Sequence, residues 1–152
     1  VFDLPWSALS YPDDLAERVR NTWAVLDPSG RLGEECLAAV ERKVAAWDAA
    51  DKSACDADRP ALLETLFGYV GDPARSTDTL RHWGAAATFA ELTPAVGRDQ
   101  LAWTLSALPY MRDRLTLPDL LVMSDEWTPE LIDRVIDRAG APEATADGPL
   151  DG

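Results

Sequence analysis

The chain has 152 residues, 47% hydrophobic and 27% charged, a balance that suits one globular domain with its own core. Its 27 acidic and 14 basic side chains give a formal net charge of −13, which disfavours nucleic acid and anionic lipid as partners. No apolar run approaches the roughly 20 residues of a membrane span, and Cys36 and Cys55 are predicted to be reduced thiols. We therefore expect a cytoplasmic protein that contacts neither nucleic acid nor membrane.

The first part of the chain predicts an arm followed by two helices. Residues 1–12 lack a helical period, but we expect them to pack as an N-terminal arm through Phe2, Leu4, Trp6 and Leu9. Apolar residues then recur at helical spacing over 15–26, behind a Pro-Asp-Asp start at 12–14, where acids favour a helix N-terminus. Asp-Pro-Ser-Gly at 27–30 breaks the chain, and a second helix is predicted at about 31–50.

The middle of the chain predicts a loop and two more helices. Residues 52–58 are polar and are interpreted as a loop. Asp58 followed by Pro60 then predicts the start of a third helix, which Gly-Asp-Pro at 71–73 ends. A fourth helix is predicted at about 77–90, and one side of it is expected to carry Leu80, Trp83 and Ala87.

Two Thr-Pro pairs later in the chain are typical helix starts, because the hydroxyl caps the helix and proline suits its first turn. Thr93-Pro94 is predicted to open a helix that carries Leu101, Leu105 and Leu108. Thr128-Pro129 is predicted to open a helix that Gly140 closes.

The remaining segments complete an all-α prediction. The apolar residues 117–123 are interpreted as one more short helix, and 141–152, which are small, acidic and proline-containing, as a flexible C-terminal tail. No stretch alternates apolar and polar residues long enough to predict a strand. The sequence therefore predicts one all-α domain over 13–140 with about six or seven helices.

Four segments resemble the globin domain of bacterial flavohaemoglobins and single-domain globins. Asp-Arg-Pro-Ala-Leu opens 58–69, which is similar to the family's distal helix. Residues 80–94 resemble its proximal helix, 101–108 the next long helix, and Trp-Thr-Pro-Glu at 127–130 the start of its last helix. The resemblance covers most of the predicted domain and implies a globin-like bundle.

Departures from the family pattern imply that haem binding has been lost. The place of the iron-binding histidine holds Ala87, and a methyl group cannot ligate iron. The family's distal glutamine falls at Asp58, and no tyrosine stands near Cys36 and Leu37 to bond an iron-bound oxygen. Trp83, four residues before Ala87, is expected to share its helix face and to fill part of the vacated space. Because an empty cavity of that size is costly, the rest is expected to be filled by side chains or by another apolar ligand. No cofactor is therefore expected.

The resemblance also places a remodelled ligand pocket. Its predicted lining is Cys36, Leu37, Val40, Asp58, Leu62, Leu66, Trp83, Ala87 and Trp103. No catalytic residue and no metal ligand is assigned. His82 is the only histidine, which excludes a multi-histidine zinc site, and we interpret it as structural.

The favoured hypothesis is a haem-free, globin-like binding or regulatory module. It would sense an apolar small molecule in the remodelled pocket, or act through contacts with a protein partner or a second copy of itself. An alternative is a small enzyme that uses the vacated pocket as a substrate cavity, with Asp58 or a nearby acid as base. A third hypothesis keeps haem, bound through His82 or a cysteine, and a Soret absorbance band would distinguish it.

Overall fold

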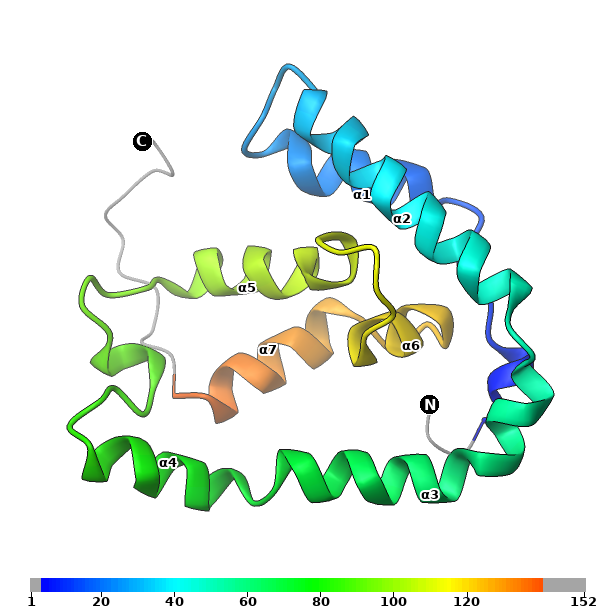
Figure 1. The fold of residues 1–152 in the computed structure, drawn as a ribbon. Helices are drawn as coiled ribbons and strands as arrows, with labels where there is room; N and C mark the ends of the chain where they lie inside the picture. The colour runs from blue at the N-terminus through cyan, green and yellow to red at the C-terminus, as the bar shows by residue number, and fades with distance from the viewer. Residues whose placement is uncertain (1–3, 141–152) are drawn as a thin grey trace.

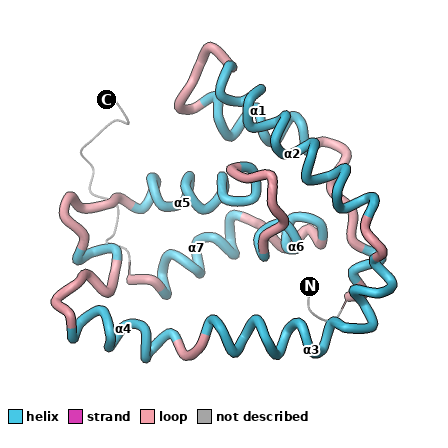
Figure 2. Tube along the Cα trace, in the orientation of Figure 1, coloured by secondary structure: helices cyan, strands magenta, loops and turns pink. Residues whose placement is uncertain are grey.

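The computed structural model describes residues 4–140, apart from the side chain of Val70. The predicted tail at 141–152, and Phe2 of the predicted arm, lie outside the described residues. Over 4–140 the chain folds into seven α-helices and three short 3-10 helices, with no β-strand (Figure 2). This confirms the predicted all-α class and the predicted number of helices. No helix of that part is both long and apolar enough to cross a membrane.

The helices follow one another as shown in Figure 1. The α-helices are α1 (Leu15–Ala24), α2 (Arg31–Ala49), α3 (Lys52–Val70), α4 (Pro73–His82), α5 (Arg98–Ala107), α6 (Leu117–Met123) and α7 (Pro129–Arg138). The 3-10 helices are η1 (Trp6–Ala8), η2 (Phe89–Glu91) and η3 (Leu108–Tyr110).

Helices α1, α2, α6 and α7 confirm the sequence prediction, and local hydrogen bonds explain where two of them start. The Asp27 carboxylate accepts hydrogen bonds from the backbone N–H groups of Ser29 and Leu32, and Gly30 supplies a left-handed residue (φ 79°) before α2. The Thr128 hydroxyl accepts from the Leu131 N–H at 3.3 Å and caps α7. In both places the turn chemistry seen in the sequence fixes the helix boundary.

The predicted boundaries of three helices are wrong. The helix predicted at about 77–90 is α4, which begins at Pro73 and ends at His82. Residues 52–58 are helical and not a loop, because Asp51 caps α3 by accepting from the Ala54 N–H at 3.2 Å. Pro60 therefore lies inside α3 and not in its first turn. The helix predicted to open at Pro94 begins only at Arg98, after Gly97.

The main core lies where α1 and α2 pack against α5 and η3. Its buried residues are Leu15, Val19, Trp23, Leu37, Val40, Ala107 and Tyr110. The Trp103 ring of α5 meets the Trp23 ring edge-on at 5.5 Å between centroids, a favourable geometry for aromatic pairs. The Trp103 indole N–H donates to the Thr22 carbonyl at 2.9 Å, so this packing also satisfies a polar group.

A buried ion pair joins α2 to α6. The Lys43 ammonium, 3% exposed, lies 2.5 Å from the Asp119 carboxylate, which is fully buried, and also donates to the Pro109 carbonyl. The second carboxylate oxygen of Asp119 accepts from the N–H and the hydroxyl of Thr116 at 2.7 and 2.6 Å, and the Tyr11 hydroxyl donates to the first oxygen at 3.1 Å. Every partner of Asp119 is thus supplied by the fold, which is the condition for burying a charge.

The N-terminal segment packs onto α2 and α3. Leu9 is buried beside Trp47, whose indole N–H donates to the Leu9 carbonyl at 3.2 Å. Asp56 of α3 accepts from the Trp6 N–H at 2.5 Å and from the Ser7 hydroxyl at 2.7 Å. These bonds attach η1 to the first half of α3.

Helices α3 and α4 form a separate span, residues 52–82, which runs along the lower edge of Figure 1 below α5 and α7. Among the described residues, the backbone of α3 packs closely along only one other element, η1. The backbone of α4 packs closely along no other element to a similar extent. Large apolar side chains of the span and the turn after it are consequently exposed: Leu62, Leu66, Phe67, Tyr69, Leu80 and Trp83.

Candidate functional site

The residues predicted to line one pocket are divided among several places in the structure. Cys36, Leu37, Val40 and Trp103 belong to the packed region between α1, α2 and α5. Leu37 and Val40 are buried there, and Cys36, partly buried, packs against them; burial raises the pKa of its thiol, and the charge of Glu35 adds to the effect. This part of the predicted pocket is solid core.

The predicted pairing of Trp83 and Ala87 on one helix face is wrong. Helix α4 ends at His82, and Gly84 takes a left-handed conformation (φ 68°) that turns the chain away from the helix axis. Ala87 follows in a non-helical segment. Trp83 is 79% exposed, with its ring edge-on to the His82 ring at 5.6 Å. The indole therefore does not fill an interior space.

Leu62 and Leu66 face a groove that we call the α3–α6 groove, a trough of about 430 Å³ between α3, η1 and the start of α6. Its lining is almost entirely apolar or aromatic: Trp6, Leu62, Leu63, Thr65, Leu66, Tyr69, Leu115, Thr116, Leu117 and Leu120. Contiguous exposed apolar surface of this kind marks interaction sites in soluble proteins.

Two regular features build this groove. Leu62, Leu66 and Tyr69 are spaced i, i+4, i+7, so they share one face of α3, and all three are exposed. The opposite wall starts at Leu117, where Thr116 and Asp119 form a reciprocal capping box at the N-terminus of α6. Since Asp119 is also bonded to Lys43, the wall opposite α3 is fixed to the core.

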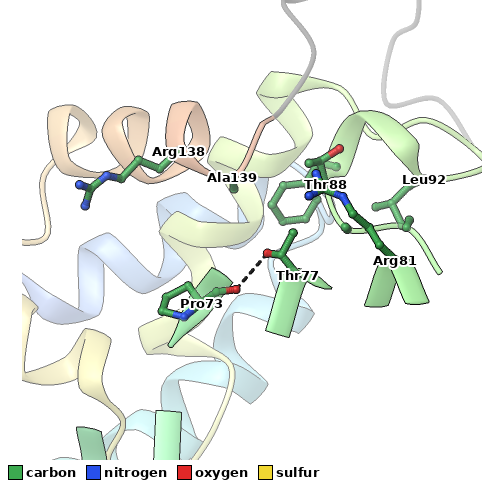
Figure 3. A pocket seen from close by; sticks show the side chains of 10 residues that line it. Pro73, Thr77, Arg81, Thr88, Leu92, Arg138 and Ala139 are labelled. Carbon is green, nitrogen blue, oxygen red and sulfur yellow. Dashed lines mark hydrogen bonds between the residues drawn. The ribbon is translucent and has the colours of Figure 1, made fainter. Parts of the chain in front are cut away.

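Ala87 lines a second depression, which we call the α4–α7 hollow, of about 490 Å³ (Figure 3). It lies between α4, the segment that contains η2, and the end of α7. Its lining residues are Pro73, Thr77, Arg81, Ala86, Ala87, Thr88, Phe89, Leu92, Arg138 and Ala139. The hollow thus combines an apolar surface with two hydroxyls and two guanidinium groups.

A close backbone approach forms one end of this hollow. The Ala90 N–H donates to the Gly140 carbonyl at 3.3 Å, and a Cβ built on Gly140 would lie 3.1 Å from the Thr88 methyl carbon. Gly140 also has φ 65°, so glycine meets two requirements there. Nearby, the Glu91 carboxylate accepts from the Ala87 N–H at 2.7 Å, and this bond is the main reason that the pKa of Glu91 is lowered.

The described residues offer binding surfaces more clearly than a reaction centre. Asp58, the base of the enzyme alternative, is exposed on α3 and lines neither the groove nor the hollow. Within the described part of the chain no three His, Cys, Asp or Glu side chains gather as metal ligands would. Cys36 and Cys55 are both free thiols and partly buried.

The sequence pattern missed the features that make these two surfaces. Leu62, Leu66 and Tyr69 have the spacing of a core-facing stripe, and nothing local reveals that no helix covers them. Arg81 and Arg138 are far apart in the chain, so no motif brings them together. The end of α4 was also missed, since the helix was predicted to run to about residue 90, although Gly84, two residues after His82, is a typical helix stop that could have revealed it.

Comparison of the chain with protein-family models, with curated proteins and with solved structures found no match. The fold and the two surfaces therefore define the class of protein by themselves. It is an all-α protein whose described part has seven α-helices, three clusters of buried apolar residues and an exposed apolar helical span.

Proposed function

We propose that the protein is a binding module that docks an amphipathic helix of another protein in the α3–α6 groove. The observation that carries the proposal is the exposed face of Leu62, Leu66 and Tyr69 on α3, opposite the apolar start of α6. A helix that lays its own apolar side into such a groove is a common recognition mode, with anchors at i, i+3, i+4 and i+7.

Charge indicates the kind of helix that fits. The chain has a formal net charge of −13, so a helix with basic residues flanking its apolar face is attracted over the whole surface. An acidic helix meets repulsion before it can reach the groove. We therefore propose a partner segment with an apolar face and basic flanks.

A second candidate occupant is an apolar small molecule. The groove volume of about 430 Å³ falls in the range of roughly 300–1,000 Å³ that small-molecule sites occupy. Its open shape and the further exposed residues along α3, such as Phe67, favour a longer ligand. Binding of a small apolar probe without any binding of helical peptides would favour this second candidate.

From the resemblance to bacterial globins we propose in addition that the protein does not bind haem. Residue 87 is an alanine, which offers iron no ligand. We therefore expect the protein, made with adequate haem, to be purified without a Soret absorbance band. A Soret band that disappears in His82→Ala would contradict this part and would support the haem alternative.

The docking proposal can be tested with designed peptides. The probes are a Leu/Lys amphipathic helix of about four turns and a Leu/Glu helix of the same apolar pattern, each carrying a fluorophore for anisotropy measurements. We expect the basic peptide to bind and Leu66→Ser to weaken its affinity about tenfold, as loss of a central apolar anchor does. The acidic peptide is expected not to bind.

Leu26→Ser provides the matched control, because Leu26 is also an exposed leucine but lies outside the groove. We expect this variant to bind the basic peptide as tightly as the unchanged protein. If Leu66→Ser and Leu26→Ser bind the peptide equally well, the attraction is non-specific electrostatics and the groove is not the docking site. Circular dichroism of both variants checks that their helices are intact.

A further inference from the structure

We propose that the α4–α7 hollow is a separate site for a small organic anion, an apolar body with one oxyanion group. The oxyanion would bind at Arg81, and the apolar body would lie against the Phe89 and Leu92 side of the hollow. Arg138, on α7, would be a second cationic contact from the opposite wall. In Figure 3 the Arg81 side chain extends from α4 toward Thr88, whereas Arg138 lies at the other side of the hollow with its guanidinium directed away from Arg81.

The charge of the lining points to an anion. The two charged residues among those that line the hollow are both arginines, whereas the whole chain has 27 acidic and 14 basic side chains. Guanidinium groups match oxyanions with paired N–H donors. An apolar surface with cations and without carboxylates is complementary to an amphiphilic anion.

Neighbouring carboxylates have other partners, which leaves the arginines available. Asp133 and Asp137 of α7 both pair with Arg98 of α5, at 2.8 and 2.6 Å, so neither neutralises Arg138. Glu91 is held by the backbone N–H of Ala87, with the nearby charge of Arg81 making a smaller contribution to its lowered pKa. Glu91 is thus an acid close enough to Arg81 to compete with an incoming anion.

The size and composition of the hollow fit a ligand of one or two rings. Its volume of about 490 Å³ lies within the roughly 300–1,000 Å³ of small-molecule sites. Pro73, Ala87, Phe89 and Leu92 supply apolar contact, and Thr77 already donates its hydroxyl to the Pro73 carbonyl at 3.0 Å. Affinity would come from the apolar body, and selection for an anion from the guanidinium groups.

Two fluorescent probes separate the anionic from the apolar contribution. The first is 1-anilinonaphthalene-8-sulfonate, and the second is N-phenyl-1-naphthylamine, which has the same aromatic body without the sulfonate. We expect Arg81→Gln to weaken the sulfonate probe about tenfold, the effect of losing one charge-assisted hydrogen-bonded contact. Arg138→Gln is expected to weaken it less, and binding of the neutral probe should change less than twofold in either variant.

Arg75→Gln is the matched control, because Arg75 is an exposed arginine of the same helix that does not line the hollow. It should leave the affinity of the sulfonate probe unchanged, whereas Glu91→Gln, which removes the competing charge, should raise it. If the double variant Arg81→Gln/Arg138→Gln binds the sulfonate probe as tightly as Arg75→Gln does, the proposal is overturned.

Displacement of the sulfonate probe identifies the anionic group. The competitors are 2-naphthoate, 2-naphthyl phosphate and the neutral 2-naphthamide, which share one aromatic body. Displacement by the carboxylate or the phosphate at concentrations about tenfold below the amide supports the site and says which oxyanion it prefers. Equal displacement by all three means that the hollow selects only for the apolar body, and the anion proposal fails.

Discussion

The α1–α2–α5 core and the α3–α4 span are both rich in apolar residues, yet the fold treats them differently. In the core, Leu37 is 5% exposed and is packed among residues from three elements. On the span, Leu66 is 38% exposed and faces the open groove. Both leucines lie on long helices of 19 residues, so helix formation alone does not decide burial.

The difference lies in what covers each helix. Apolar residues of α2 meet α1 on one side and η3 on another, whereas α3 meets η1 near its beginning and is bare farther along. The apolar groups of α3 are also less confined to one side of the helix, since Leu62, Leu63, Leu66 and Phe67 cover more than one face. A helix that is apolar on several faces needs more than one covering element, and residues 4–140 supply only part of that cover.

The sharpest way to break the packed region is to remove a partner of its buried ion pair. Asp119→Ala leaves the Lys43 ammonium buried beside Pro109 without a counter-charge, and we expect a loss of about 3–5 kcal/mol in the free energy of unfolding. Urea denaturation at neutral pH measures the loss. The double variant Lys43→Met/Asp119→Leu should recover most of it, because no uncompensated charge remains. A loss below about 1 kcal/mol for Asp119→Ala would contradict burial of the pair.

Matched truncations test the comparison directly. Leu37→Ala should cost about 2–5 kcal/mol, because it removes buried methyl groups and leaves a cavity. Leu66→Ala should cost less than about 1 kcal/mol, because the side chain is already in contact with solvent. Both values come from the same urea titration. Equal costs would mean that α3 is covered in solution, for example by a second copy, and a measurement of oligomeric state would then decide.

The smallest effect concerns alkaline pH. Burial raises the pKa of Tyr11, and the charge and hydrogen bond of Asp119 raise it further; burial also raises the pKa of Tyr110. The folded state therefore holds both phenols neutral, while the unfolded chain loses these protons near pH 10. Stability is fully present below about pH 10 and falls as the pH rises above it.

Tyrosine variants separate this titration from other alkaline effects. Tyr11→Phe should lower stability at pH 7 by about 1 kcal/mol through loss of the hydrogen bond to Asp119, and should reduce the loss above pH 10. Thermal unfolding followed by circular dichroism between pH 7 and 11 measures both. If the alkaline loss is as steep in Tyr11→Phe/Tyr110→Phe as in the unchanged protein, these phenols do not cause it.

The sequence predicts those parts of the fold that local chemistry decides. The Thr128 cap and the break at Asp27 to Gly30 set helix boundaries through bonds within a few residues, so both are readable. The polar run at 52–58 was predicted to be a loop. The Asp51 cap that starts α3 just before it is recognised only from the hydrogen bond that the Ala54 N–H donates to the Asp51 carboxylate. The candidate surfaces depend on contacts between distant segments, such as Gly140 against Thr88, which no local pattern encodes.

The resemblance to globins predicted a single interior pocket because it assumed that residues 83 and 87 share a helix. Because Gly84 is left-handed, α4 ends before residue 87 and the two residues do not share a helix. The residues predicted to line one pocket lie instead in the core, in the α3–α6 groove and in the α4–α7 hollow. Gly84 lies six residues before the end of the helix predicted at about 77–90, and this glycine outweighs the periodicity, since the period is only a weak indication over so few residues.

The contrast between Trp83 and the Trp23–Trp103 pair provides the protein with built-in optical reporters. Trp83 is exposed to solvent at the end of α4, so its emission is expected at long wavelength and should be quenched by iodide. The two edge-on rings of the core are shielded by the protein and are expected to emit at shorter wavelength. Unfolding of the core and ligand binding near the end of α4 can thus be followed in one unlabelled sample from tryptophan emission at different wavelengths. Trp83→Phe is expected to remove only the long-wavelength part of the tryptophan emission.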